Sequence, residues 1–222
     1  MIEVVEREYK MEPGMKLKLG NINGYVKMEG YDGNTLKLRA EKKWGLLGAE
    51  PKIKIKKEGN TLIIKVKQKR SFGISIGESA VNFELLIPKE VEIEVASVNG
   101  SITVKNISKA DKIATVNGRI HVENVEPRKI STVNGTIKAL MTRISSDAGI
   151  STVNGSIEVY VPKNANVEVR ASTVNGKITT DIPGEISKTP IYGPKSFMGI
   201  LGEGRHKLKI SAVNGSITIK LR

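Results

Sequence analysis

The sequence predicts an all-β repeat protein, a β-solenoid similar to a parallel β-helix, with coils of about 17–21 residues. The tripeptide Val-Asn-Gly occurs six times, with Asn at positions 99, 117, 134, 154, 175 and 214, and subtraction gives spacings of 18, 17, 20, 21 and 39. The last spacing is close to two periods, and a fixed spacing of this size is characteristic of stacked repeats. Apolar and polar residues alternate on both sides of each copy, as in strands with one buried face.

The columns around each Asn predict the two strands of a coil. Ile stands three residues after Asn in every copy, at Ile102, Ile120, Ile137, Ile157, Ile178 and Ile217. The next position is polar and the one after it is mostly apolar, which is the period of a half-buried strand. Before Asn come Val, small residues and, four positions back, an apolar residue such as Ile113. Each copy is therefore predicted to be strand, Asn-Gly corner, strand.

Asn-Gly between apolar segments is commonly a two-residue hairpin turn. A hairpin would pair the Val before Asn with the residue after Gly on the same face. That residue is polar or charged in all six copies: Ser101, Arg119, Thr136, Ser156, Lys177 and Ser216. The mismatches favour a corner where Val and the later Ile both turn inward, in coils that each stack in parallel on the last. Val then has opposite strand parity to the apolar residue three positions before it, which requires a bulge or a sheet covered on both faces.

In such a stack the Asn side chains would form a buried, hydrogen-bonded ladder, with adjacent Cα atoms about 4.8 Å apart. The predicted ladder consists of Asn99, Asn117, Asn134, Asn154, Asn175 and Asn214. Gly follows Asn because the corner is expected to need a backbone conformation that a Cβ opposes. The alternative is a row of Asn residues that binds a ligand.

The pattern extends over the chain, so we assign residues 1–222 to a single domain. A seventh copy, with Ile in place of Val, is found at Ile22-Asn23-Gly24. Residues 1–81 are more divergent and basic, whereas residues 82–222 contain the regular repeats. Two segments are predicted to be loops, Trp44–Pro51 and the Gly- and Pro-rich stretch 183–204. The second takes the place of a missing copy and is either a degenerate coil or an excursion from the stack.

Three segments resemble a known family: Leu17–Gly24, the region from Asn82 to Ile102, and the region from Gly199 to Ile217. Together they resemble the putative adhesin family of β-strand-repeat domains, also described as toast-rack-like, over nearly the whole chain. The resemblance implies an all-β repeat domain of unknown biochemical role, often in prokaryotic proteins linked to the cell envelope. It implies no catalytic residues.

The net charge of +13 is concentrated between residues 36 and 70, where twelve Lys or Arg residues face three Glu. The alternation of this segment would project lysines from one face of two strands: Lys52, Lys54, Lys56, Lys65, Lys67 and Lys69. This face is a candidate site for a polyanion such as nucleic acid, anionic lipid or acidic polysaccharide. The alternative is a sheet edge that lysines protect against aggregation, and the lack of interleaved aromatic residues for base stacking favours it.

The sequence offers no catalytic, cofactor-binding or metal-binding residues. The two histidines, His121 and His206, lack metal-ligand spacing, and the chain has no nucleophile elbow or phosphate loop. We therefore expect a non-enzymatic structural or interaction module, with a protein partner or with self-association through the ends of the stack, and no small-molecule substrate. Polyanion binding through the basic face of residues 36–70 is the alternative.

Cellular location is left open by the sequence. Residues 1–10 contain no apolar signal core, and the chain has no stretch of about 20 apolar residues. The chain as written is expected to be cytoplasmic, or at the cell surface if a leader has been removed. Abundant Lys and Glu without cysteine also suggest a thermophile.

Overall fold

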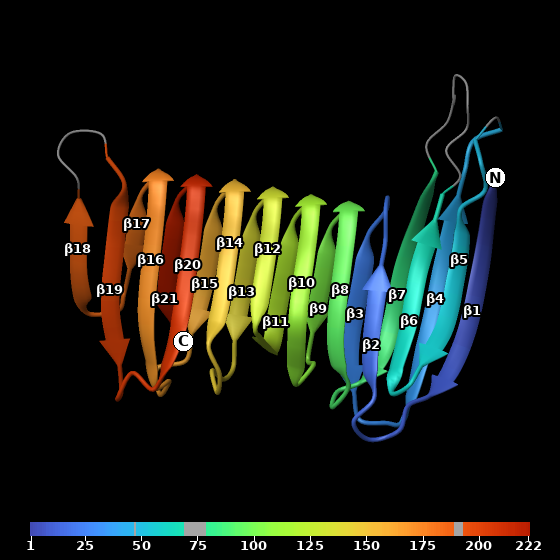
Figure 1. Cartoon of the computed structure of the whole chain (residues 1–222), viewed down its shortest axis with the longest axis horizontal. Coiled ribbons are helices and arrows are strands. Elements are labelled where there is room, and N and C mark those ends of the chain that lie inside the picture. Colours follow the sequence, from blue (N-terminus) through green and yellow to red (C-terminus); the bar gives the residue numbers. More distant parts are fainter. Residues whose placement is uncertain (47, 69–78, 189–192) are drawn as a thin grey trace.

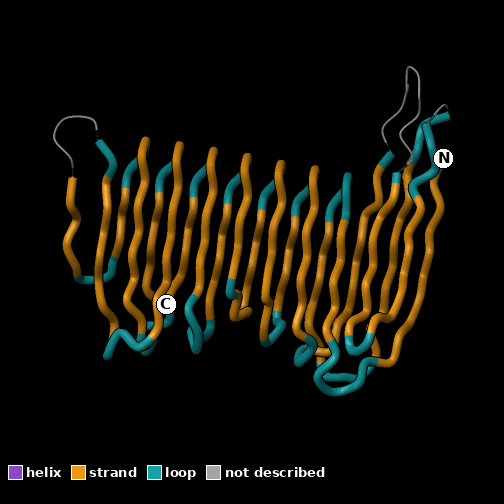
Figure 2. Tube along the Cα trace, viewed as in Figure 1, coloured by secondary structure: helices purple, strands orange, loops and turns teal. Residues whose placement is uncertain are grey.

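The computed structural model describes residues 1–46, 48–68, 79–188 and 193–222. Within these ranges the chain forms 21 β-strands and no helix, so the predicted all-β class is confirmed. Figure 1 shows an elongated, open stack of strands, and Figure 2 shows that short loops connect them along two opposite margins.

The strands lie in two opposed layers. In spatial order, sheet A contains β1 (Ile2–Lys10), β4 (Thr35–Lys43), β7 (Ala80–Pro88), β3 (Val26–Tyr31), β9 (Ile102–Lys105), β11 (Ile120–Pro127), β13 (Ile137–Met141), β15 (Ile157–Val161), β21 (Ile217–Leu221) and β17 (Ile178–Thr180). Sheet B contains β5 (Lys52–Glu58), β6 (Thr61–Lys67), β2 (Lys16–Gly20), β8 (Glu92–Asn99), β10 (Lys109–Asn117), β12 (Lys129–Asn134), β14 (Ala148–Asn154), β20 (His206–Asn214), β16 (Val167–Asn175), β19 (Lys195–Leu201) and β18 (Gly184–Lys188).

Each regular coil runs from a strand of sheet B, around the Asn-Gly corner, into a strand of sheet A. Neighbouring coils pair in parallel and in register, so that Asn117 lies between Asn99 and Asn134. Because each corner lies beside the same corner of the next coil, the structure is the predicted solenoid and not a series of hairpins.

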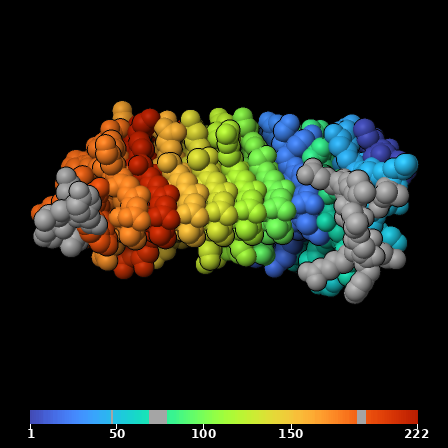
Figure 3. Space-filling view, turned by 90° about the horizontal axis from the view of Figure 1, so that it is seen from above, coloured from blue at the N-terminus to red at the C-terminus, as the bar shows by residue number. Residues whose placement is uncertain are grey.

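The coils do not follow chain order at the two ends of the stack. Coil β20–β21 pairs with β14–β15 on one side and with β16–β17 on the other. Coil β2–β3 is likewise inserted between β6–β7 and β8–β9. Figure 3 shows the red band of the C-terminal coil lying between orange neighbours. The expectation that each coil stacks on the previous one is therefore wrong at both ends.

The core lies between the sheets, but the Val of each corner is outside it. The exposed fraction is 42% for Val98, 40% for Val116, Val133 and Val153, 46% for Val174 and 41% for Val213. The interpretation that this Val turns inward is therefore wrong. The residue before it, Thr in most copies, is buried instead. The alternation of buried and exposed residues thus continues unbroken from the apolar residue four positions before Asn. The outward Val therefore requires neither a bulge nor a second layer over the outer face of the sheet.

A small polar side chain is suited to this buried position because it meets a corner carbonyl of the neighbouring coil. Thr152 Oγ1 donates a hydrogen bond to the Gly135 carbonyl at 3.2 Å, and Thr173 Oγ1 donates to that of Gly215 at 2.8 Å. The buried hydroxyl and the carbonyl are both satisfied in this way. The narrow corner therefore holds a small side chain in every copy, Thr in four of them and Ser97 and Ala212 in the other two.

Antiparallel strands close both ends of the stack. In sheet A, β4 is antiparallel to β7 and β1 to β4, while β5 is antiparallel to β6 in sheet B. At the other end, β19 is antiparallel to β16 and β18 to β19. There Lys195 Nζ donates to the Gly176 carbonyl at 2.5 Å, where a further coil would have placed a Thr. The segment 183–204 was predicted as a loop, but its described residues include β18 and β19; residues 189–192 lie outside the described part.

Candidate functional site

The corners place seven Asn side chains in one continuous row. Each donates from Nδ2 to the Oδ1 of its neighbour in the order Asn175, Asn214, Asn154, Asn134, Asn117, Asn99 and Asn23, at 2.8–2.9 Å. Asn23 Nδ2 then donates to the carbonyl of Ser79 at 3.0 Å. The six Asn residues of the predicted ladder are exposed, so the expectation of a buried row is wrong. All the amides point in the same direction along the stack.

The six exposed valines lie beside this row and form what we call the valine ridge: Val98, Val116, Val133, Val153, Val213 and Val174. A row of cations runs parallel to the ridge on the outer face of sheet B. This row contains Lys112, Lys129, Lys209 and Arg170, four positions before the valines of their strands. Arg170 is paired with Glu168, and Glu94 on β8 is the register partner of Lys112. Since four residues of a strand span about 13 Å, the face combines an apolar line with a basic line at that separation.

Four of the predicted polyanion-binding residues form a compact group, the lysine block. Lys52 is the direct cross-strand partner of Lys67, and Lys54 is that of Lys65. All four side chains are exposed and have no ion pair within the described residues. Like charges directly opposite each other are unfavourable. Of the other two candidates, Lys56 is paired with Glu58, and Lys69 lies outside the described residues.

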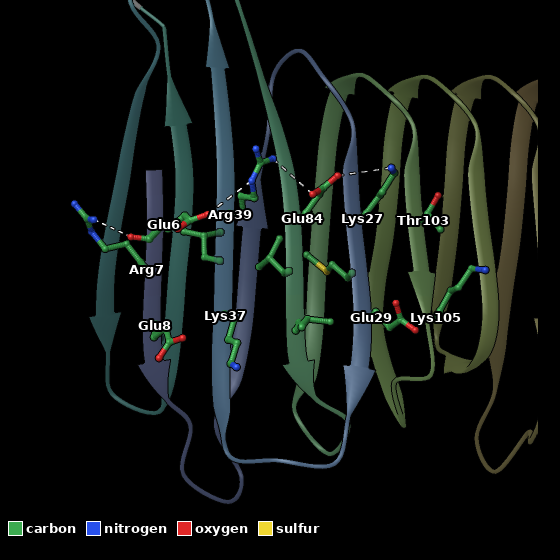
Figure 4. Close-up of a pocket in the computed structure, with 14 residues that line it drawn as sticks. Glu6, Arg7, Glu8, Lys27, Glu29, Lys37, Arg39, Glu84, Thr103 and Lys105 are labelled. Atoms are coloured by element: carbon green, nitrogen blue, oxygen red, sulfur yellow. Dashed lines mark hydrogen bonds and ion pairs between the residues drawn. The ribbon is translucent and has the colours of Figure 1, made fainter. Parts of the chain in front are cut away.

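A groove of about 760 Å³ lies on the outer face of sheet A near its β1 end. Figure 4 shows its lining side chains on β1, β4, β7, β3 and β9. The lining residues are Glu6, Arg7, Glu8, Lys27, Met28, Glu29, Lys37, Leu38, Arg39, Glu84, Leu85, Leu86, Thr103 and Lys105. No sequence pattern indicated this site, because its residues come from five separate strands.

One row of groove residues is internally neutralised. Arg39 lies 3.8 Å from the Glu6 carboxylate and 3.7 Å from that of Glu84, and Lys27 lies 3.7 Å from Glu84. The Tyr25 hydroxyl also donates to Glu84 at 3.0 Å. Partial burial, together with this hydrogen bond, raises the pKa of Tyr25. The charges of this row are therefore paired with one another.

The second row of the groove carries free charges. Across the strands it reads Glu8, Lys37, Leu86, Glu29 and Lys105, each the register partner of the next. Leu86 is 43% exposed. Lys105 pairs with Glu123 at 3.1 Å, whereas Glu8, Lys37 and Glu29 have no hydrogen bond or ion pair from their side chains to other described residues.

No group of three His, Cys, Asp or Glu residues in the described ranges is arranged to hold a metal ion. His121 lies on the outer face of sheet A, with Nε2 3.5 Å from the Glu123 carboxylate. The described chain also has no helix that could cross a membrane.

The chain is similar to known proteins in sequence and in fold. The family model Toastrack DUF4097 matches residues 92–220. The crystal structure of a putative cell adhesion protein from Clostridium sporogenes has a TM-score of 0.55 and 14% identity, covering 99% of this chain and 100% of that one. A putative adhesin from Bacteroides fragilis has a TM-score of 0.33 and 11% identity, with 99% and 97% covered. No curated protein matches the chain.

Proposed function

Because the chain belongs to the Toastrack DUF4097 family, we propose that it is a non-enzymatic, adhesin-like interaction module of the cell envelope. Its proposed partner is a protein that binds along the valine ridge. The observation that carries the proposal is the exposure of the same Val in all six copies, at 40–46%. Lines of exposed apolar side chains are typical of interaction surfaces.

The geometry of the ridge favours a protein partner with acidic residues. Six valines at one strand spacing form an apolar line about 24 Å long. A partner that covers this line would remove apolar surface from water, which is the main favourable contribution to association. Lys129 and Lys209 of the parallel row would attract acidic groups beside the apolar contact and increase the rate of association.

Self-association of two copies is less favoured than binding to a different protein. Two copies that met through this face would bring basic rows together on molecules of net charge +13. End-to-end stacking would have to pair the capping strands, and β5 carries Lys52, Lys54, Lys56 and Lys57 along that edge. Lysines on an edge strand oppose such pairing.

Changing Val116, Val133 and Val153 together to Thr should weaken binding to an envelope preparation of the source organism at least tenfold. Thr keeps the β-branched shape at an exposed strand position, so the midpoint of thermal unfolding should change by only a few degrees. Binding is measured by surface plasmon resonance, with the matched Val→Ile triple variant expected to retain it. Equal binding by the Thr and Ile variants would refute the role of the ridge.

A second candidate function is polyanion binding by the lysine block. Lysines on β5, the last strand of sheet B, can be explained as protection of the sheet edge against aggregation. Such protection does not account for Lys65 and Lys67, because β6 is covered by β5 on one side and by β2 on the other. An anionic polymer would offset the repulsion between the opposed lysines and release its own counterions.

Binding to immobilised heparin should weaken steeply with salt, and the Lys54→Gln, Lys67→Gln variant should elute at a clearly lower salt concentration. Removing two contacts should reduce the slope of log K against log salt by roughly 1.5. The matched control is Lys16→Gln, Lys18→Gln on β2, since these lysines are already paired with Glu92 and Glu94 at 2.8 Å. If both double variants behave alike, only net charge matters and the lysine block is not a site.

A further inference from the structure

The groove on the outer face of sheet A combines a hollow that is open to solvent with unpaired charges. Its volume of about 760 Å³ is within the range of ligand-binding sites. It lies on the sheet opposite the valine ridge and contains none of the lysine block. A ligand there would thus be independent of both surfaces described above.

The free charges of the groove have a defined order. Lys37 on β4, Leu86 on β7 and Glu29 on β3 are successive register partners, with Glu8 on β1 beyond Lys37. Adjacent strands lie about 4.8 Å apart, so the four positions form a line across the sheet with that step. The groove therefore presents, in order, an anion, a cation, an exposed apolar side chain and a second anion. Figure 4 shows Glu8, Lys37 and Glu29 spread along this line, below the paired row.

An α-helix has the matching period. Residues i−4, i, i+4 and i+7 lie on one helix face, and with a rise of 1.5 Å per residue their mean step is about 5.5 Å. An extended peptide repeats a face only every second residue, with a step of about 6.7 Å. The helical step is closer to the strand spacing, so a helix laid across the strands keeps its side chains opposite the groove positions over four strands.

We propose that this groove binds an amphipathic α-helix of a partner protein, with basic, acidic, apolar and basic residues at i−4, i, i+4 and i+7. They face Glu8, Lys37, Leu86 and Glu29 in that order. The row that contains the Arg39–Glu84 ion pair forms one side of the groove. Because its charges are already paired, it requires no charged residue on the bound helix. Polyanions are disfavoured as ligands because Glu8 and Glu29 carry free negative charge in the same row.

The proposal is tested with a synthetic Ala-based helical peptide that has Lys, Glu, Leu and Lys at these relative positions, by fluorescence anisotropy. Exposed ion pairs are weak individually, so the apolar contact should matter most. Leu86→Ser should reduce affinity about tenfold and Lys37→Glu severalfold, with circular dichroism and thermal unfolding unchanged because both side chains are exposed.

The decisive experiment exchanges the charges of Lys37 and of the peptide residue that faces it. Lys37→Glu combined with a peptide whose Glu is replaced by Lys should recover affinity to within about threefold, as expected for a direct pair in a double-mutant cycle. A control peptide of the same composition with a central Pro cannot form the helix. Equal binding of the Pro peptide, equal binding to Leu86→Ser, or no recovery after charge exchange would each overturn the proposal.

Discussion

Replacing Gly135 with Ala should lower the free energy of unfolding by about 3 kcal/mol or more, which is a large effect for one methyl group. A Cβ at this position would lie 1.9 Å from the carbonyl oxygen of Gly118 in the neighbouring coil. The same contact recurs from coil to coil, with 2.1 Å at Gly118 and 1.9 Å at Gly155. Both partners in the clash are backbone of paired coils, so the local strand spacing would have to increase.

The control for this experiment is Gly149→Ala on β14. A Cβ there meets no atom within 4 Å, so stability should change by no more than about 0.5 kcal/mol. Chemical denaturation of the two variants against the parent protein provides the comparison. Similar stabilities for both variants would show that the close approach of the corners does not require glycine.

At most corners glycine is required for a different reason from the one that the sequence predicts. The sequence suggested a backbone conformation that only glycine adopts easily. Among the six regular copies only Gly155 has such a conformation, with φ of +147°, and the seventh copy has Gly24 at +103°. At Gly118 and Gly135 the requirement is instead the space taken by the adjoining carbonyl.

Removing residues 206–222 should abolish cooperative unfolding of the chain. These residues form an internal layer, and without them the edges of β14–β15 and β16–β17 would lose their partners. The large side chains lost from the core are Leu208, Ile210, Ile217 and Ile219. At about 1.5–3 kcal/mol each, they contribute on the order of 6–12 kcal/mol, which is comparable with the whole stability of a typical domain.

The matched truncation removes residues 1–10. These include β1, which among the described strands pairs with β4 alone, at the end of sheet A. None of them is fully buried, and only Val5 and Tyr9 pack partly against the core within the described residues. We expect this variant to unfold cooperatively at a lower denaturant concentration, as measured by circular dichroism. If the two truncations cost the same, the inserted C-terminal coil contributes no more than an edge strand.

The coil and its in-register stacking could be predicted because every copy repeats the same columns. The direction of the corner Val could not be settled in the same way. Strand alternation from Ile130 points Val133 outward, whereas the recurrence of an apolar residue at this position in every copy favours a place in the core. The inward position beside the corner carbonyl of the next coil is narrow, and it is filled by a small residue such as Thr132, whose hydroxyl donates to that carbonyl.

The order of the coils was not predictable for a related reason. Ile157 pairs with Ile217, and the same Ile217 pairs with Ile178, so equivalent columns fit several neighbours equally well. Local patterns identify a coil but do not say which coil lies beside it.

The candidate surfaces differ in the same respect. The lysine block could be found from the sequence because Lys52 and Lys54 alternate within one strand, and Lys65 and Lys67 within the next. The groove could not, since its central row joins Lys37, Leu86 and Glu29 from strands that are distant in the sequence. Only the pairing of β4 with β7, and of β7 with β3, brings them together.

The uniform direction of the Asn row makes the molecule electrically polar along its length. Every side-chain amide from Asn175 to Asn23 is oriented with its N–H toward the β6–β7 end, so the small dipoles add and polarise one another. The positive pole of this row and the lysine block lie toward the same end of the stack. In the field of a negatively charged surface, the molecule should therefore turn that end toward the surface before any contact is made.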